Sequence, residues 1–156
     1  MRRTVMLSCA LLVASAASFA ADVTYRTDIQ PLWIQQCSDC HGAKSPYLGE
    51  FEEKKKAFED QSQGPRMDTY ADLIFYIGWP DTGALMRRLD DGKSAADGKP
   101  GNMYRYLGGT TEERQKNLTL FKEWVGTDAW KHNRWQARGK VPAITKEEMD
   151  RIKVKY

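Results

Sequence analysis

Three residues within a span of five, Cys37, Cys40 and His41, carry the clearest chemistry in the sequence. They form the pattern Cys-x-x-Cys-His, which attaches a c-type haem covalently. Two thiols three positions apart can each add to one vinyl group on the edge of a porphyrin, while the adjacent imidazole reaches the iron from one face. The spacing predicts one covalent haem, with the two cysteines as thioether residues and His41 as an axial iron ligand.

The cysteine pair has two other interpretations. A redox-active disulfide normally opens a helix in a chain of alternating strands and helices, and no such alternation is found in this sequence. A structural zinc site needs four ligands, but the only other cysteine or histidine residues are Cys9 and His132. Zinc would therefore require the isolated His132 and a carboxylate, so haem is the preferred interpretation.

The first 20 residues resemble an export signal. Two arginines precede an apolar stretch at 5–17, and small residues occupy most of 18–20. This pattern predicts a signal peptide over 1–20 that is cleaved before Ala21, and hence a periplasmic protein. Cys9 would be discarded with it. No apolar stretch approaches the roughly 20 residues that a membrane span requires, so we expect no span.

Charge is unevenly distributed along the rest of the chain. Residues 21–126 hold 14 basic and 17 acidic side chains, whereas 127–156 hold 8 basic and 4 acidic ones. Together the two ranges hold 22 basic and 21 acidic side chains. This near balance of charge argues against nucleic-acid binding. We expect one haem-binding domain at 21–126 and a basic extension at 127–156, which packs on the domain because Trp130 and Trp135 need a surface to cover.

Turn and capping signals divide the chain into short helices without a convincing strand. The first helix is expected at 28–36, with Asp28 as its N-cap and Pro31 in its first turn, and it leads into Cys37. Further helices are predicted at 49–60, from Asp68 to Ile77, from Asp81 to Gly92, at 111–125 after the capping residue Thr110, and after the capping residue Thr145. The predicted fold class is all-α.

The second axial ligand decides whether a haem protein carries electrons or binds other molecules. Met103 follows Pro100-Gly101-Asn102 in a loop 62 residues after His41. That length allows the chain to pass around the porphyrin edge, and a loop can present a side chain freely. Met103 is the preferred ligand. The alternatives are Met67, Met86, Met149 and His132, of which Met86 lies on an amphipathic helix where core packing is its ordinary role.

The helix that leads into Cys37, the loop at 100–103 and the amphipathic helix at 111–125 together resemble class I c-type cytochromes. The resemblance covers residues 24–126 and extends to periplasmic monohaem cytochromes that exchange electrons with external donors or acceptors. It implies His41 and Met103 as axial ligands of one haem c.

The same resemblance implies that the first and last core helices cross, here 28–36 against 111–125. Trp33 is expected at that crossing with Phe121 or Trp124. The chain departs from the family in its long segment 43–66 and in its C-terminal extension, which puts the usual exposure of the haem in question.

Several side chains are candidates for hydrogen bonds to the haem propionates. They are Tyr76, Trp79, Arg87, Arg88, Tyr104 and Arg105. Arginine suits this role because its guanidinium can contact both oxygens of a carboxylate. We single out Trp79, Tyr76 and Arg105. Core packing is the alternative role for Tyr76 and Trp79, and a solvated charge is the alternative for Arg87 and Arg88.

The expected function is therefore one-electron transfer, not catalysis, by a monomeric periplasmic protein that meets transient redox protein partners. Two alternatives remain open. One is a haem enzyme or ligand sensor whose sixth iron position is open or displaceable. The other is a haem subunit fixed in a larger oxidoreductase, with the extension as its docking arm.

Overall fold

The computed structural model describes residues 22–79, 82–131 and 144–156. Helices are the only regular secondary structure in these ranges, which confirms the all-α prediction. In chain order the elements are η1 (Tyr25–Ile29), α1 (Gln30–Gln36), α2 (Ser38–His41), α3 (Leu48–Glu53), α4 (Lys55–Asp60), α5 (Tyr70–Phe75), α6 (Ala84–Leu89), η2 (Tyr104–Leu107), α7 (Thr111–Val125), η3 (Ala129–Lys131) and α8 (Lys146–Met149). The predicted signal peptide, Asp81, His132 and Trp135 lie outside the described residues.

The N-terminal helical segment begins before the predicted cap. Thr24 is the N-cap of η1, and its hydroxyl accepts a hydrogen bond from the Thr27 N–H at 3.2 Å. The Asp28 carboxylate accepts the Thr24 N–H at 2.8 Å, and this bond, followed by that from the Thr27 hydroxyl, lowers the pKa of Asp28. Asp28 therefore lies in the first turn instead of capping it. Both residue types favour N-caps, so composition alone does not choose between them.

A similar correction applies at α5, where Thr69 is the N-cap and its hydroxyl accepts a hydrogen bond from the Asp72 N–H. The predicted cap, Asp68, instead uses its carboxylate to bind Arg66. A local ion pair with a residue two positions earlier therefore engages the side chain that was predicted to cap the helix.

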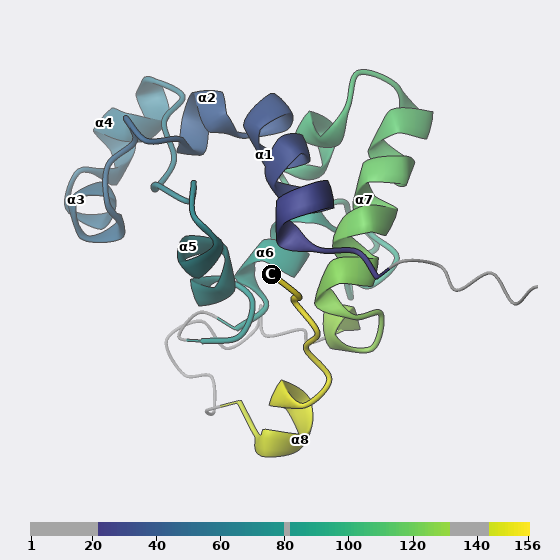
Figure 1. The fold of residues 1–156 in the computed structure, drawn as a ribbon. Coiled ribbons are helices and arrows are strands. Elements are labelled where there is room, and N and C mark those ends of the chain that lie inside the picture. Colours follow the sequence, from purple (N-terminus) through teal and green to yellow (C-terminus); the bar gives the residue numbers. More distant parts are fainter. Residues whose placement is uncertain (1–21, 80–81, 132–143) are drawn as a thin grey trace, which may run out of the picture.

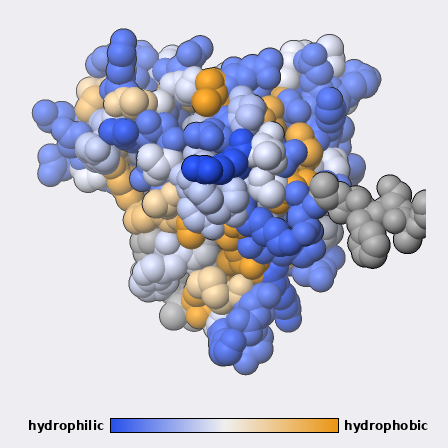
Figure 2. Space-filling model, viewed as in Figure 1, coloured by the Kyte–Doolittle hydropathy of each residue, from blue (hydrophilic) through white to orange (hydrophobic). Residues whose placement is uncertain are grey.

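The predicted helix at 49–60 is divided into α3 and α4 at Lys54, which has φ −126° and ψ 30°. The rings of Phe51 and Phe58 stack with centroids 6.2 Å apart. Seven residues of one straight helix would separate them by about 10 Å along the axis, so the break brings the rings together. Figure 2 shows mostly hydrophilic residues over this part of the surface, at its upper left.

The N-terminal segment meets α7 through η1, most of which precedes the helix predicted at 28–36. η1 packs against α7, and the Tyr25 ring lies 6.1 Å from that of Trp124. Trp33 is buried in the same core, and its ring lies 6.2 Å from that of His41. Figure 1 shows α7 beside the N-terminal helices. The sequence analysis did not assign Tyr25 to this contact.

The end of the chain runs back over the core between α5 and α7 (Figure 1). The Val154 N–H donates to the Trp124 carbonyl at 2.8 Å, and the Tyr70 hydroxyl donates to the Val154 carbonyl at 2.7 Å. The Lys155 carbonyl accepts two hydrogen bonds at 2.8 Å, from the Tyr25 N–H and from the Trp124 indole. These last residues therefore join three separate helical elements.

None of the helices in the described ranges is long and apolar enough to cross a bilayer.

Truncation after Ile152 should lower the free energy of unfolding by about 2–5 kcal/mol, because several hydrogen bonds to the core are lost together. Denaturant unfolding of the haem-loaded protein, followed by circular dichroism, measures the change. Lys155→Ala keeps the backbone carbonyl and serves as the control. A truncated protein as stable as that control would contradict a structural role for the C-terminal residues.

Candidate haem site

The cysteine and histidine residues of the motif lie on one turn of helix. Cys37 separates α1 from α2, and its N–H still donates to the Trp33 carbonyl at 2.8 Å. The N–H groups of Cys40 and His41 both donate to the Cys37 carbonyl, at 3.2 and 3.0 Å. Both thiols are free and partly buried. The backbone therefore presents two unpaired thiols and the imidazole from one rigid turn.

The protonation of Cys37 does not suit a redox-active disulfide. Burial, followed by the neighbouring Cys40, raises the pKa of the Cys37 thiol to about 12. Thiol–disulfide exchange needs a thiolate, which reactive cysteines obtain through a lowered pKa. A zinc site also lacks its ligands, since no three His, Cys, Asp or Glu side chains of the described residues are placed to hold one metal ion.

The His41 ring is held in the orientation that a metal ligand requires. Its Nδ1 lies 2.8 Å from the Pro65 carbonyl oxygen. A carbonyl only accepts hydrogen bonds, so Nδ1 carries the proton and the lone pair of Nε2 is available. Burial lowers the pKa of His41, the bond to Pro65 opposes that shift, and the positive charge of Arg88 adds to it. The neutral imidazole, which is the form that binds metals, is therefore favoured.

Residues 64–67 form a strap against the motif. The Gly64 N–H donates to the Cys40 carbonyl at 2.8 Å, and the Met67 N–H donates to the His41 carbonyl at 2.9 Å. A Cβ atom at Gly64 would lie 2.1 Å from Cε1 of His41. Only glycine allows the strap to approach the ring this closely. This contact was not predicted, although the Gly64-Pro65 dipeptide in the sequence indicates a turn at this position.

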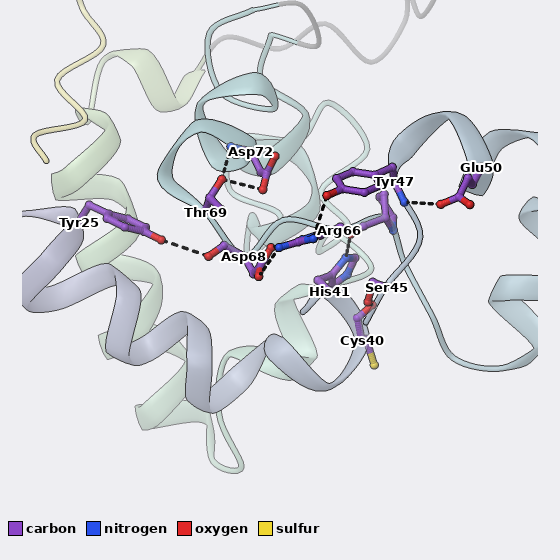
Figure 3. A network of polar contacts seen from close by, with 11 residues as sticks. Tyr25, Cys40, His41, Ser45, Tyr47, Glu50, Arg66, Asp68, Thr69 and Asp72 are labelled. Carbon is purple, nitrogen blue, oxygen red and sulfur yellow. Dashed lines mark hydrogen bonds and ion pairs between the residues drawn. The ribbon is translucent and has the colours of Figure 1, made fainter. Parts of the chain in front are cut away.

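Arg66 holds the strap from its other side (Figure 3). Its Nε and Nη2 donate to the two carboxylate oxygens of Asp68 at 2.6 and 3.2 Å, and its Nη1 donates to the Tyr47 hydroxyl at 2.9 Å. The Ser45 hydroxyl donates to the Cys40 carbonyl at 3.0 Å. Figure 3 shows the Cys40 sulfur pointing away from this network. These polar contacts of the long segment 43–66 were not predicted.

Met103 occupies a tethered loop position. It is partly buried and packs against the core, immediately before η2. Its N–H donates to the Arg88 carbonyl at 2.9 Å, and the Gly101 N–H donates to the Asp90 carbonyl at 2.8 Å. A Cβ atom at Gly101 would lie 2.2 Å from the Arg87 carbonyl oxygen, so the loop packs directly on the end of α6.

The other candidate ligands lie in different surroundings. Met86 and Met67 are buried in the core, with 1% and 7% of their surface exposed, and Met149 lies exposed on α8. His132 falls outside the described residues. Ligation by Met103 stays a prediction. Met86 lies in the core as its helical spacing indicated, whereas the burial of Met67 was not predicted.

The three propionate candidates lie in unlike environments. Tyr76 is buried at 8% exposure, and Trp79 is exposed at 61%. The Arg105 guanidinium lies 4.7 Å from the centroid of the Tyr106 ring and donates to its hydroxyl at 2.6 Å. Their roles in propionate binding stay predictions.

Trp33 is a further candidate donor that the sequence analysis did not assign to this role. Its indole Nε1 is the one buried side-chain nitrogen or oxygen, among the described residues, without a hydrogen-bond partner. Leaving such a donor unpaired costs about 1–3 kcal/mol. A haem carries carboxylate acceptors, and the Trp33 ring lies 6.2 Å from that of His41. Free thiols, an available Nε2 and this unpaired donor together fit a covalent haem.

Comparisons with known proteins agree with this geometry. The model of the PccH cytochrome c family matches residues 24–156. The structure of the monohaem cytochrome PccH from Geobacter sulfurreducens is 53% identical in sequence. That match covers 87% of this chain and 100% of the other, with a TM-score of 0.75. No curated protein sequence matches the chain.

Replacing Gly64 with alanine should displace the His41 ring or the strap and lower the free energy of unfolding by about 1–3 kcal/mol, as overpacking does. Denaturant unfolding and the midpoint potential of the haem-loaded protein measure the two effects. Gly49→Ala is the matched control, because a Cβ atom at Gly49 meets nothing within 4 Å. If both variants behave alike, Gly64 does not position His41.

Proposed function

Since this chain belongs to the PccH cytochrome c family and carries one covalent haem c, we propose that it passes single electrons between proteins, with Cys37 and Cys40 holding the haem and His41 and Met103 as axial ligands. When bound, the haem supplies an iron that takes up and releases one electron. The protein residues bind the haem, orient it and limit the access of substrates and gases to its iron.

The observation that carries the proposal is the hydrogen bond between His41 and Pro65. It leaves Nε2 as the only available nitrogen of the ring and prevents the ring from turning. The strap is itself held on both sides, by hydrogen bonds to Cys40 and His41 and by the bond from the Arg66 side chain to the Tyr47 hydroxyl. A ligand on so rigid a support keeps the same position in both oxidation states, and electron transfer needs little rearrangement.

The Met103 loop supports a carrier over an enzyme or a ligand sensor. Hydrogen bonds from Gly101 and Met103 to the end of α6 hold the loop in place. A thioether on the second face of the iron closes that face to substrates and gases. An enzyme or sensor with a displaceable sixth ligand would need a loop that can move away from the iron, and this loop is tied at two backbone positions.

The alternative of a permanent subunit is less well supported. Residues 153–156 make their hydrogen bonds within the chain, to η1, α5 and α7. This part of the extension is therefore engaged internally and does not form a free docking arm. We propose a carrier whose protein contacts are small and short-lived, because a shuttle must dissociate after each transfer.

The ferric protein should show a sulfur-to-iron charge-transfer band in the far red, and Met103→Ala should remove it and lower the midpoint potential, since methionine ligation raises that potential. Met149→Ala, which changes an exposed methionine, is the control and should keep the band. A high-spin ferric spectrum in the unmodified protein would refute His/Met ligation and favour an open sixth position.

We further propose that residues 1–20 direct export to the periplasm. In a bacterial host with haem-attachment machinery, the haem-stained protein should appear in the periplasmic fraction and elute as a monomer on size exclusion. A variant lacking residues 2–20 is the control and should remain unstained in the cytoplasm. Elution in a large complex from native cells would instead favour the fixed-subunit alternative.

A further inference from the structure

We propose that Trp130, in the C-terminal extension, is a positioning residue for Met103 and acts through the buried carboxylate of Asp90. The inference rests on the proposed function, in which Met103 ligates the iron. It assigns part of the extension a role in the redox site. Three sets of contacts carry it.

The first is the environment of the Asp90 side chain, which is only 3% exposed. Its Oδ1 accepts hydrogen bonds from the N–H groups of Gly92 and Ser94, at 2.8 and 3.1 Å. Its Oδ2 accepts the indole N–H of Trp130 at 2.8 Å. Hydrogen bonds to a charged acceptor are stronger than neutral ones, and a buried carboxylate is costly when it loses a donor. The Trp130 bond therefore stabilises a charge that the fold places inside the protein.

The second is the position of Asp90 in the Met103 loop. Asp90 is the C-cap of α6, and its side chain holds the first residues of the following loop. Its backbone carbonyl accepts the Gly101 N–H at 2.8 Å, near the end of the same loop. Both ends of segment 91–102 are thus attached to one residue. A movement of Asp90 would shift both ends, and Met103 follows directly.

The third is the support of Trp130 itself. It lies in η3, is 4% exposed, and its N–H donates to the Gly126 carbonyl at 3.0 Å. The Lys122 Nζ lies 5.6 Å from its ring centroid and 3.7 Å from the Asp91 carboxylate. Trp130 thereby connects the loop to the end of α7, the longest helix of the described residues.

α7 also holds the loop on the other side of Met103. The Gln115 side-chain amide donates to the Tyr104 hydroxyl at 2.7 Å and to the Asp91 carboxylate at 3.3 Å. The residues before and after Met103 are therefore fixed to the same helix. Methionine sulfur is a neutral and weak donor of electron pairs, so its bond to iron depends on how firmly the loop presents it.

Trp130→Phe removes the indole donor and keeps an aromatic ring in the core. In the haem-loaded ferric protein, the equilibrium constant for loss of the far-red band should rise about tenfold or more, as expected for a hydrogen bond to a charged group. The band should disappear at a lower denaturant concentration than the helical circular dichroism. Hydrogen exchange at the N–H groups of Gly92, Gly101 and Met103 should accelerate.

Trp124→Phe is the matched control. Trp124 is 1% exposed, and its indole also donates at 2.8 Å, but to the Lys155 carbonyl. This variant should lose global stability, and its far-red band should disappear only with unfolding. If Trp130→Phe behaves in the same way, the inference is overturned and the electron-carrier proposal stands. An unmodified protein without the band would refute ligation by Met103, and the inference with it.

A measurement on the unmodified protein covers the case in which Trp130→Phe does not fold. Native-state hydrogen exchange gives an opening equilibrium for the Trp130 indole N–H and for the N–H groups of Gly101 and Met103. The inference requires that these groups open together, with the same dependence on denaturant. Exchange of the Gly101 and Met103 amides through openings that leave the Trp130 indole protected would overturn it.

Discussion

The hydrogen bond between His41 Nδ1 and the Pro65 carbonyl is the contact on which the site depends. It sets the tautomer of the imidazole, and it requires the strap at 64–67 to lie against the ring. The strap in turn requires a glycine at 64 and the Arg66 pair with Asp68. The long segment after the cysteine motif is therefore part of the site, because it supplies the carbonyl that orients the axial ligand.

The C-terminal extension has a similar relation to the second half of the site. Its last residues bridge η1, α5 and α7, while Trp130 reaches the buried carboxylate of Asp90. The long segment thus contacts His41 through the Pro65 carbonyl, and the extension contacts Asp90, which holds the loop before Met103. We interpret both as supports for the positions from which the iron would be held.

Sequence patterns predicted helix ends and helix positions well where these depend on residues close together in the sequence. The capping boxes at Thr110 and Thr145 are present, and α6 (Ala84–Leu89) lies within the helix predicted from Asp81 to Gly92. Predictions failed where neighbouring residues had equal preferences, as with Thr24 and Asp28, or where packing overrode periodicity, as in the division of α3 from α4. Neither choice is visible without the surrounding core.

The covalent chemistry is encoded within five consecutive residues, because thioether attachment and axial ligation depend on short spacings along the chain. Helix content follows from similarly short patterns. Only the folded chain decides which carbonyl orients His41, which donor stabilises Asp90, and which aromatic residue meets Trp124. Those pairs are 24, 40 and 99 positions apart in the sequence. Contacts at such separations arise from the packing of the whole core, which no spacing rule specifies.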